Sequence, residues 1–207
     1  MDYCRNIMVD KYKQFLENLD IELSNYFKEQ DKYIFCKEGC CECCKLGQFP
    51  MTQIEFDYLM DAFHSLPTNI KGIVETRIKK LKKEYDKYNN KVNKNDFEHA
   101  CPFLVGKSCS IYQNRPIICR TFGLIKSAKM KDGTEVAILP DCLHKGLNYS
   151  NVFNFLKNDF DNTKIEQHSS NKPPMTYDIS LQSIYDKNQA DIDFSQRKTM
   201  TEFLKNL

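Results

Sequence analysis

The sequence predicts a mainly α-helical fold, irregular in layout, with one small β-hairpin and a group of clustered cysteines at its centre. Three observations predict it. Long segments repeat apolar residues at helical spacing, one Asp-Gly pair separates two runs that contain apolar residues, and five of the ten cysteines fall within residues 36–44. The 207 residues are enough for one domain with a hydrophobic core and a helical appendage.

The first half of the chain carries three predicted helices. The segment Lys11–Gln30 repeats apolar residues three and four apart and predicts an amphipathic helix. Thr52 followed by Glu55 forms a capping box, which starts a short helix ending near Leu66. A third helix is expected over 69–89, and its lysines are interleaved with acids, as on a solvated outer face.

The second half contains the hairpin and shorter elements. The runs 122–130 and 134–139 flank Lys-Asp-Gly, a turn signal that predicts a β-hairpin. A helix is expected around 151–159 and a linker at 168–174, and the tail 176–207 is expected to end in a helix. We therefore expect the cysteines to lie on connections between helices.

Three regions follow from this division. Residues 1–35 are expected to form an N-terminal amphipathic helix packed on the core, residues 36–145 a domain containing the cysteine cluster, and residues 146–207 a C-terminal helical extension.

Charge and hydropathy exclude several classes of function. The net charge is +2, from 30 basic and 28 acidic residues, which gives no long-range field for nucleic acid. No apolar run approaches the roughly 18 residues of a membrane span, and the N-terminal residues do not resemble a secretory signal. We expect a cytoplasmic protein without nucleic-acid or membrane partners, in a compartment where structural disulfides are rare.

The cysteines indicate metal binding. Cys36, Cys40, Cys41, Cys43 and Cys44 are too close in sequence to satisfy disulfide geometry with one another without strain. Four further cysteines follow, at positions 101, 109, 119 and 142. Converging thiolates bind zinc in tetrahedral sites or hold iron–sulfur clusters, so the expected cofactor is an iron–sulfur cluster or zinc.

The order of these residues resembles a known family. C-x3-C-x2-C-C, then C-P-F-L, C-x-I-Y-x2-R-P-x2-C-R-x-F and a late cysteine are similar to the YkgJ-like cysteine-cluster proteins, described as zinc- or iron-chelating domains. The flagellin lysine N-methylase is a longer relative of that group. The resemblance covers Cys36 to Cys142, and it implies eight metal ligands: Cys36, Cys40, Cys43, Cys44, Cys101, Cys109, Cys119 and Cys142.

Some alternatives stay open at the level of sequence. Cys41 is an additional thiol, so either Cys40 or Cys41 is the ligand. His99 and His144 each lie two residues from a predicted ligand and could replace a thiolate, although a hydrogen-bonded or surface role is the simpler interpretation. Cys4 is interpreted as a small buried hydrophobe.

The spacing Cys36-x3-Cys40-x2-Cys43 also fits the cluster motif of radical S-adenosylmethionine enzymes. A helix instead of a strand is predicted before it, Glu42 stands where an aromatic is usual, and the alternating strands and helices of a barrel are missing. This interpretation is therefore disfavoured.

Eight thiolates permit two four-coordinate centres, or one cluster with additional thiols. Such centres carry negative charge, which neighbouring cations can compensate through hydrogen bonds to sulfur. The candidates are Lys37, Lys45, Lys107, Arg115 and Arg120. Tyr112 and Phe122 are expected to pack in the core beside the centre.

Four functional hypotheses remain, and the last of them is metal storage or trafficking, with a labile metal. The first is a metal-binding protein whose thiolates hold an iron–sulfur cluster or zinc. The second is a metal-dependent enzyme that modifies protein or peptide side chains, such as an S-adenosylmethionine-dependent lysine N-methylase; it rests on the family relative, and no catalytic residue is assigned. The third is a zinc-stabilised interaction module whose outer helices bind a protein partner.

Overall fold

The structure is a computed structural model that describes residues 2–36, 39–45, 49–89, 97–169, 172–187 and 191–207. It is mainly α-helical with a few short strands, which confirms the predicted fold class. The chain divides into two compact units, and the long helix α1 (Asp2–Glu29) contributes to both. Among the helices of the described ranges, none is long and apolar enough to cross a membrane.

Unit 1 comprises residues 1–13, 38–120 and 190–207. After the first turns of α1, its elements are η1 (Cys43–Lys45), β1 (Pro50–Thr52), α2 (Gln53–His64), α3 (Thr68–Asn89), β2 (Leu104–Val105), β3 (Ser108–Cys109), η3 (Tyr112–Asn114), most of α4 (Ile117–Thr121), β9 (Arg197–Thr199) and α7 (Met200–Lys205). The bounds of α2 and α3 agree with the helices that periodicity and capping predict.

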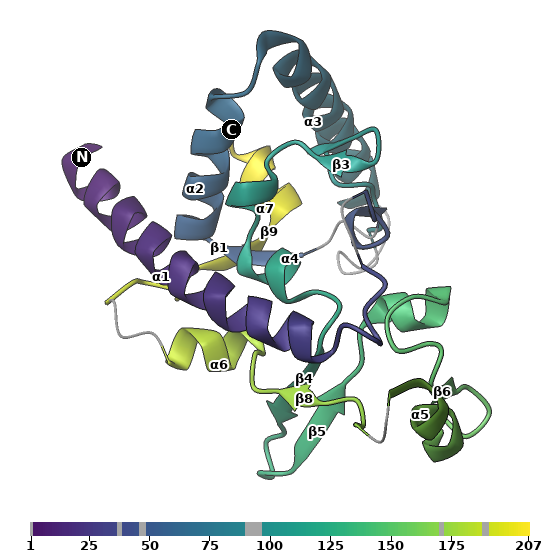
Figure 1. Cartoon of the computed structure of the whole chain (residues 1–207). Helices are drawn as coiled ribbons and strands as arrows, with labels where there is room; N and C mark the ends of the chain where they lie inside the picture. Colours follow the sequence, from purple (N-terminus) through teal and green to yellow (C-terminus); the bar gives the residue numbers. More distant parts are fainter. Residues whose placement is uncertain (1, 37–38, 46–48, 90–96, 170–171, 188–190) are drawn as a thin grey trace. The chain divides into compact units, whose positions relative to one another are not determined.

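Two segments of unit 1 that are far apart in sequence are joined by a short antiparallel pair. β1 pairs with β9, Met51 standing opposite Lys198, and Figure 1 shows both strands just below α2 and α7. Around them lies one hydrophobic core drawn from α2, α3, α7 and the 97–111 segment, with Phe56 stacked on Phe203 at 4.8 Å between ring centroids. Cys101 and Cys109 pack against this core. The core of unit 1 therefore supports two of the predicted ligands.

The predicted capping box at the start of α2 is present. Thr52 is the N-cap, and its amide and hydroxyl both donate to the Glu55 carboxylate at 2.7 and 2.8 Å. These bonds satisfy a backbone donor that the helix itself leaves without a partner. The start of α2 is thus fixed at Gln53, directly after β1.

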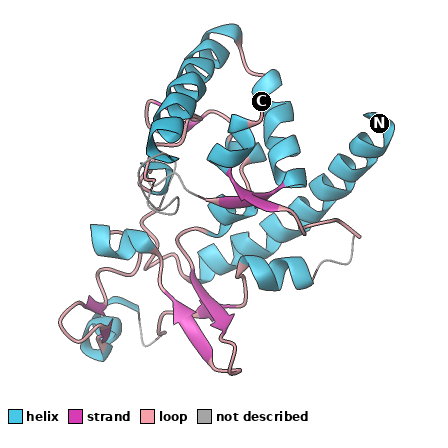
Figure 2. Cartoon of the chain, turned by 180° about the vertical axis from the view of Figure 1, so that it is seen from behind, coloured by secondary structure: helices cyan, strands magenta, loops and turns pink. Residues whose placement is uncertain are grey.

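Unit 2 comprises residues 14–37 and 121–189. Beyond the second part of α1, its elements are β4 (Ile125–Lys129), β5 (Glu135–Ile138), η4 (Asp141–Lys145), β6 (Phe153–Asn154), β7 (Asp159–Phe160), α5 (Asn162–Ser169), β8 (Thr176–Tyr177) and α6 (Leu181–Asp186). β4 and β5 form the predicted hairpin, visible as the large magenta pair in Figure 2, and β8 adds in parallel to β4.

A buried asparagine links distant segments of unit 2. Asn148 is fully buried; its Oδ1 accepts from the amides of Phe35 and Cys36 at 2.9 and 3.0 Å, and its amide donates to the Gly123 carbonyl. Gly123 has φ +102°, and a Cβ there would stand 2.7 Å from the Asn148 side chain. Close approach and backbone conformation both require glycine at this position.

Two expectations for the second half were wrong. In place of a helix over 151–159, β6 and β7 form a hairpin. The Asn154 side chain accepts from the amides of Leu156 and Lys157, and Asn158 has φ +52°, so turn-forming asparagines override the apolar spacing. The expected linker at 168–174 begins inside α5, while residues 170–171 lie outside the described ranges.

The N-terminal helix is longer than expected, and the expected C-terminal helix is present. α1 begins at Asp2 instead of Lys11, and it buries Val9, Tyr12, Leu16 and Leu19, which confirms its amphipathic face. The expected C-terminal helix is α7, of six residues, which starts with a second capping box formed by Thr199 and Glu202.

Candidate metal centre

The first cysteine cluster enters unit 1 through a single turn of 3-10 helix. This turn, η1, carries Cys43 and Cys44, whose Sγ atoms lie 4.0 Å apart. The carbonyl of Cys44 accepts a 2.7 Å hydrogen bond from the amide of Cys101. A backbone bond thus places the first cysteine cluster directly beside the start of the second.

A tight hairpin brings two more cysteines together. Leu104 pairs with Cys109 across β2 and β3, and the turn passes through Gly106 at φ +63°. The Leu104 amide also donates to the carbonyl of Cys101. Phe103, fully buried in the unit 1 core, anchors this hairpin. The sequence folds here so that Cys101 and Cys109 lie at the same end of the hairpin.

The last cysteine of unit 1 is held by α4, a helix of five residues. Pro116 precedes the helix, and its carbonyl accepts from the amide of Cys119 at 2.9 Å. Arg120 is buried and donates through Nε to the Arg115 carbonyl at 3.0 Å, and through a second nitrogen to the Gln113 carbonyl. Arg120 therefore braces the turn that leads to Cys119.

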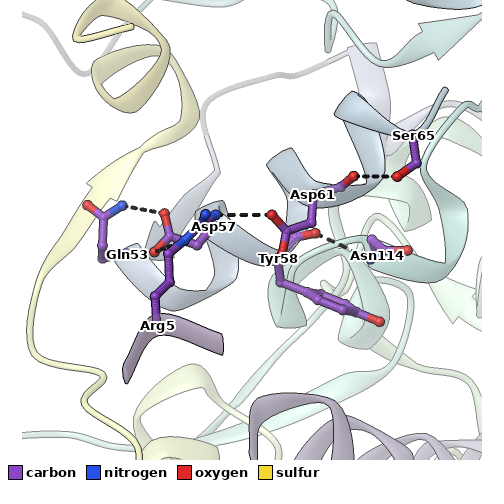
Figure 3. A network of polar contacts seen from close by, with 7 residues as sticks. All are labelled: Arg5, Gln53, Asp57, Tyr58, Asp61, Ser65 and Asn114. Atoms are coloured by element: carbon purple, nitrogen blue, oxygen red, sulfur yellow. Dashed lines mark hydrogen bonds and ion pairs between the residues drawn. The ribbon is translucent and has the colours of Figure 1, made fainter. Parts of the chain in front are cut away.

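Helix α2 supports this turn from outside. The Asn114 side chain donates to the Tyr58 carbonyl at 3.3 Å, as Figure 3 shows. On the exposed side of α2, Arg5 forms ion pairs with Asp61 at 3.1 Å and with Asp57 at 3.7 Å (Figure 3). The segment that carries Cys119 is thus attached to α2, and α2 is itself stabilised by its capping box and by the ion pairs with Arg5.

The five thiols of these segments lie close enough to affect one another's pKa. Burial raises the pKa of Cys101 to about 12, and nearby Cys109 and Cys43 add to it. Burial also raises the pKa of Cys109 and, more strongly, that of Cys119. The hydrogen bond between Cys43 and Cys44 lowers the pKa of the Cys43 thiol and raises that of Cys44. Four separated stretches of chain therefore contribute to one thiol cluster.

A cation faces this cluster. Arg115 acts to lower the pKa of Cys43, Cys109 and Cys119, although burial outweighs it for the latter two. Its guanidinium lies 3.8 Å from the ring centroid of Tyr112, and its Nε is buried without a hydrogen-bond partner in the described structure. A buried donor beside thiols is suited to a negatively charged thiolate centre.

The structure places the other predicted ligands differently. Cys40 and Cys41 are partly buried in unit 1, and both contribute to raising the pKa of Lys45, behind the larger effect of Glu42. Cys36 is exposed and Cys142 is buried in η4; both belong to unit 2. Among the described residues, no group of three or more His, Cys, Asp or Glu side chains is already arranged so that it could hold a metal ion.

The two candidate histidines make ordinary contacts. His99 is buried, with Nε2 2.8 Å from the Thr201 hydroxyl and Nδ1 3.0 Å from the Ala100 carbonyl, so both ring nitrogens have partners. Burial lowers its pKa. His144 is exposed and lies against Phe155. The hydrogen-bonded and surface interpretations describe both side chains.

The cations that were predicted to compensate the charge of the centre differ in what they contact. Arg115 faces the thiols, whereas Arg120 is occupied by backbone carbonyls and Lys45 by Glu42. Lys107 is exposed at the hairpin turn, and Lys37 lies outside the described residues, as does the side chain of Cys4. Tyr112 was expected in the core but is 47% exposed, because it forms the platform for Arg115.

The comparison with protein families decides what kind of domain this is. Residues 35–137, about half of the chain, match the model of the CxxCxxCC family, whose description reads "Putative zinc- or iron-chelating domain". This segment is a CxxCxxCC domain. The comparisons with curated proteins and with solved structures give no significant match. The CxxCxxCC domain includes all the predicted ligands except Cys142, which follows its end.

The residues of the CxxCxxCC domain fit the metals named in this description. Thiolates are ligands for both zinc and iron–sulfur clusters, and the cluster in unit 1 offers five thiols where a tetrahedral site takes four. The buried Nε of Arg115 supplies a hydrogen-bond donor of the charge that such a centre requires. The donor set and its cation therefore agree with zinc or iron chelation.

Proposed function

We propose that the protein is a metal-binding protein in which cysteine thiolates of the CxxCxxCC domain hold zinc or an iron–sulfur cluster. The observation that carries this proposal is the placement of thiols in unit 1: the Sγ atoms of Cys43 and Cys44 lie 4.0 Å apart, and the Cys101 amide donates to the Cys44 carbonyl at 2.7 Å. The electrostatic influence of these thiols on one another and on Cys109 and Cys119 agrees with it. Soft thiolates in this number favour zinc or iron–sulfur clusters over hard cations such as magnesium.

The main centre takes its ligands from these five thiols. Cys43 and Cys44 come from η1, and the other three come from the β2–β3 hairpin region and α4. Ligands from separate stretches of chain close a site and stabilise the fold, because metal-binding free energy becomes folding free energy. Cys40, also in unit 1, is a further donor for this centre, whereas Cys36 and Cys142 belong to unit 2 and stay predicted ligands.

Arg115 compensates the charge of the centre. A site formed only by thiolates carries net negative charge, which is costly in a half-buried environment. The guanidinium stays protonated, and stacking on Tyr112 fixes its orientation. Replacing Arg115 by Gln should weaken metal binding by about 10- to 100-fold, as changes beside metal ligands typically do.

Metal analysis of anaerobically purified protein tests the proposal. A brown protein that contains iron and sulfide, with broad visible absorption, indicates a cluster; a colourless protein that contains zinc in stoichiometric amount indicates a zinc site. The chain should be reduced and then offered zinc, or iron with sulfide, in separate reconstitutions. Failure to retain either metal after gel filtration would contradict the proposed function.

A further inference from the structure

Glu55 is a buried carboxylate with hydrogen bonds in two directions. Its side chain is 1% exposed. One oxygen, Oε2, accepts from the amide and the hydroxyl of Thr52 and completes the capping box of α2. The other, Oε1, accepts a 2.9 Å hydrogen bond from the amide of Ile117, which is 62 residues away in sequence. A capping box requires only the first of these contacts.

The second contact reaches the segment that holds Cys119. Ile117 is the first residue of α4 and lies two residues before Cys119 and two after Arg115. The first amides of a helix have no acceptor within the helix, so the Ile117 amide needs one from elsewhere. Glu55 supplies that acceptor and at the same time fixes the start of α4 against the start of α2.

We infer that Glu55 is a positioning residue of the metal centre: it holds α4 so that the sulfur of Cys119 stays within reach of the ion held by the other thiols. This inference rests on the proposed function, since it requires a metal bound by the unit 1 thiols. Glu55 acts through the backbone of α4, because its carboxylate accepts from the Ile117 amide two residues before Cys119. The metal affinity of the domain therefore depends on a carboxylate that is not a ligand.

The contact requires a carboxylate and not an amide. Three donors converge on Glu55, and both of its oxygens accept. Glutamine offers one accepting oxygen and places an NH2 group against either the Thr52 donors or the Ile117 amide. A buried donor left without an acceptor is strongly disfavoured, so E55Q displaces one of the two helix starts.

The chain contains a matched control. Glu202 completes the capping box of α7 in the same way, with Oε2 accepting from the Thr199 amide at 2.9 Å and from its hydroxyl at 3.1 Å. α7 belongs to unit 1 and carries no cysteine. E202Q therefore disturbs an equivalent capping box without touching a cysteine-bearing segment.

The test uses the full-length chain as wild type, E55Q and E202Q, reduced and free of metal. Each is titrated anaerobically with Co²⁺, whose sulfur-to-metal charge-transfer absorption reports the number of thiolates bound, and zinc affinity is measured by competition with a chelator. Circular dichroism checks that each variant is folded. We expect E55Q to bind zinc about 10- to 100-fold more weakly than wild type, with a smaller charge-transfer absorption per cobalt, and E202Q to match wild type in both.

Each other outcome overturns a defined statement. Equal affinities and spectra for E55Q and E202Q would exclude a positioning role. Weaker zinc binding by E55Q with an unchanged cobalt spectrum would also exclude it, because this result would show only a general loss of stability. Wild type that binds neither metal would contradict the proposed function itself. If E55Q does not fold, E55D and E202D are compared in the same way. Aspartate keeps both carboxylate oxygens but is one methylene shorter. Equal zinc affinities and cobalt spectra for these two variants would overturn the inference.

Discussion

The two units treat their cysteines differently. In unit 1, Cys43, Cys44, Cys101, Cys109 and Cys119 affect one another's pKa, Arg115 acts to lower the pKa of three of them, and backbone bonds fix the turns that carry them. In unit 2, Cys36 is exposed, Cys142 is buried in a 3-10 turn, and the hydrogen-bonding centre is Asn148. The comparison teaches that the same residue type marks a shared site only where several chain segments bring it to one place.

Removal of metal should produce the largest difference between the units. A ligand at about 1,000 times its Kd stabilises the folded state by about 4 kcal/mol, which in a chain of this size raises Tm by about 8–16 °C. Hydrogen exchange should slow on zinc binding mainly in peptides from residues 97–120, and much less in 125–138. Equal slowing in both would contradict a main centre formed by the thiols of unit 1.

Single cysteine replacements sharpen the comparison further. We expect C119S to weaken zinc binding by about 100-fold or more, since losing a ligand costs at least as much as losing its hydrogen-bonded neighbours. C142S, in unit 2, should weaken binding less than C119S does. Chelator competition measures both affinities, and C4S, outside the set of predicted ligands, serves as the control. A reversed order would move the main centre away from the thiols of unit 1.

The stability of the metal-free protein should fall at high pH because of unit 1. Burial raises the pKa values of Cys101, Cys109 and Cys119 above the ordinary thiol value of 9.0. The folded state therefore keeps protons that the unfolded chain gives up, and stability present below pH 9 is lost as pH rises through the raised values. The lowered pKa of Cys43 has the opposite sign, but it is one thiol against four, since the pKa of Cys44 is raised as well.

Urea unfolding of the reduced, metal-free chain between pH 7 and 10.5 measures this effect. The slope is at most about 1.4 kcal/mol per pH unit for each thiol. The double variant C109S/C119S should show a flatter decline than wild type. The zinc-bound protein should behave oppositely at lower pH, because the metal competes with protons for thiolates and its affinity rises with pH. A metal-free chain whose stability stays constant up to pH 10.5 would contradict the burial of these thiols.

The smallest effect is expected on the outer surface of unit 1. Arg5 is half exposed, so its ion pairs with Asp57 and Asp61 contribute at most about 1 kcal/mol and weaken with salt. R5A should lower the free energy of unfolding within this limit, in urea titrations at low and high salt. Its zinc affinity should equal that of wild type, and a clear loss of affinity would show that the outer face of α2 controls the metal centre.

The sequence predicted the elements that local patterns determine. The capping box of Thr52 and Glu55, the helix after it and the β4–β5 hairpin were all confirmed, because capping, periodicity and the Asp-Gly turn act within a few residues. The helix expected over 151–159 was wrong, because the hydrogen bonds of Asn154 and the left-handed backbone of Asn158 determine a turn that apolar spacing does not reveal.

The site was predictable as a list of cysteines, and its arrangement was not. The motif indicated which thiols to consider, and the eight-ligand assignment stays a prediction. The bond from Cys101 to the Cys44 carbonyl and the bond from Ile117 to Glu55 join residues far apart in sequence, and no local pattern predicts such contacts. Arg120 shows the same limit, since it looked like a partner for sulfur and instead binds carbonyls of its own turn.

The pairing of β1 with β9 has a practical consequence for anyone who trims this chain. The family match stops at residue 137, yet Arg197–Thr199 form the second strand of the ribbon that precedes α2, and Phe203 stacks on Phe56 of that helix. A fragment cut at 137 would expose this apolar surface and leave the Met51 strand without its neighbour. Expression of residues 35–137 alone should therefore give an aggregating product, although it contains seven of the eight predicted ligands.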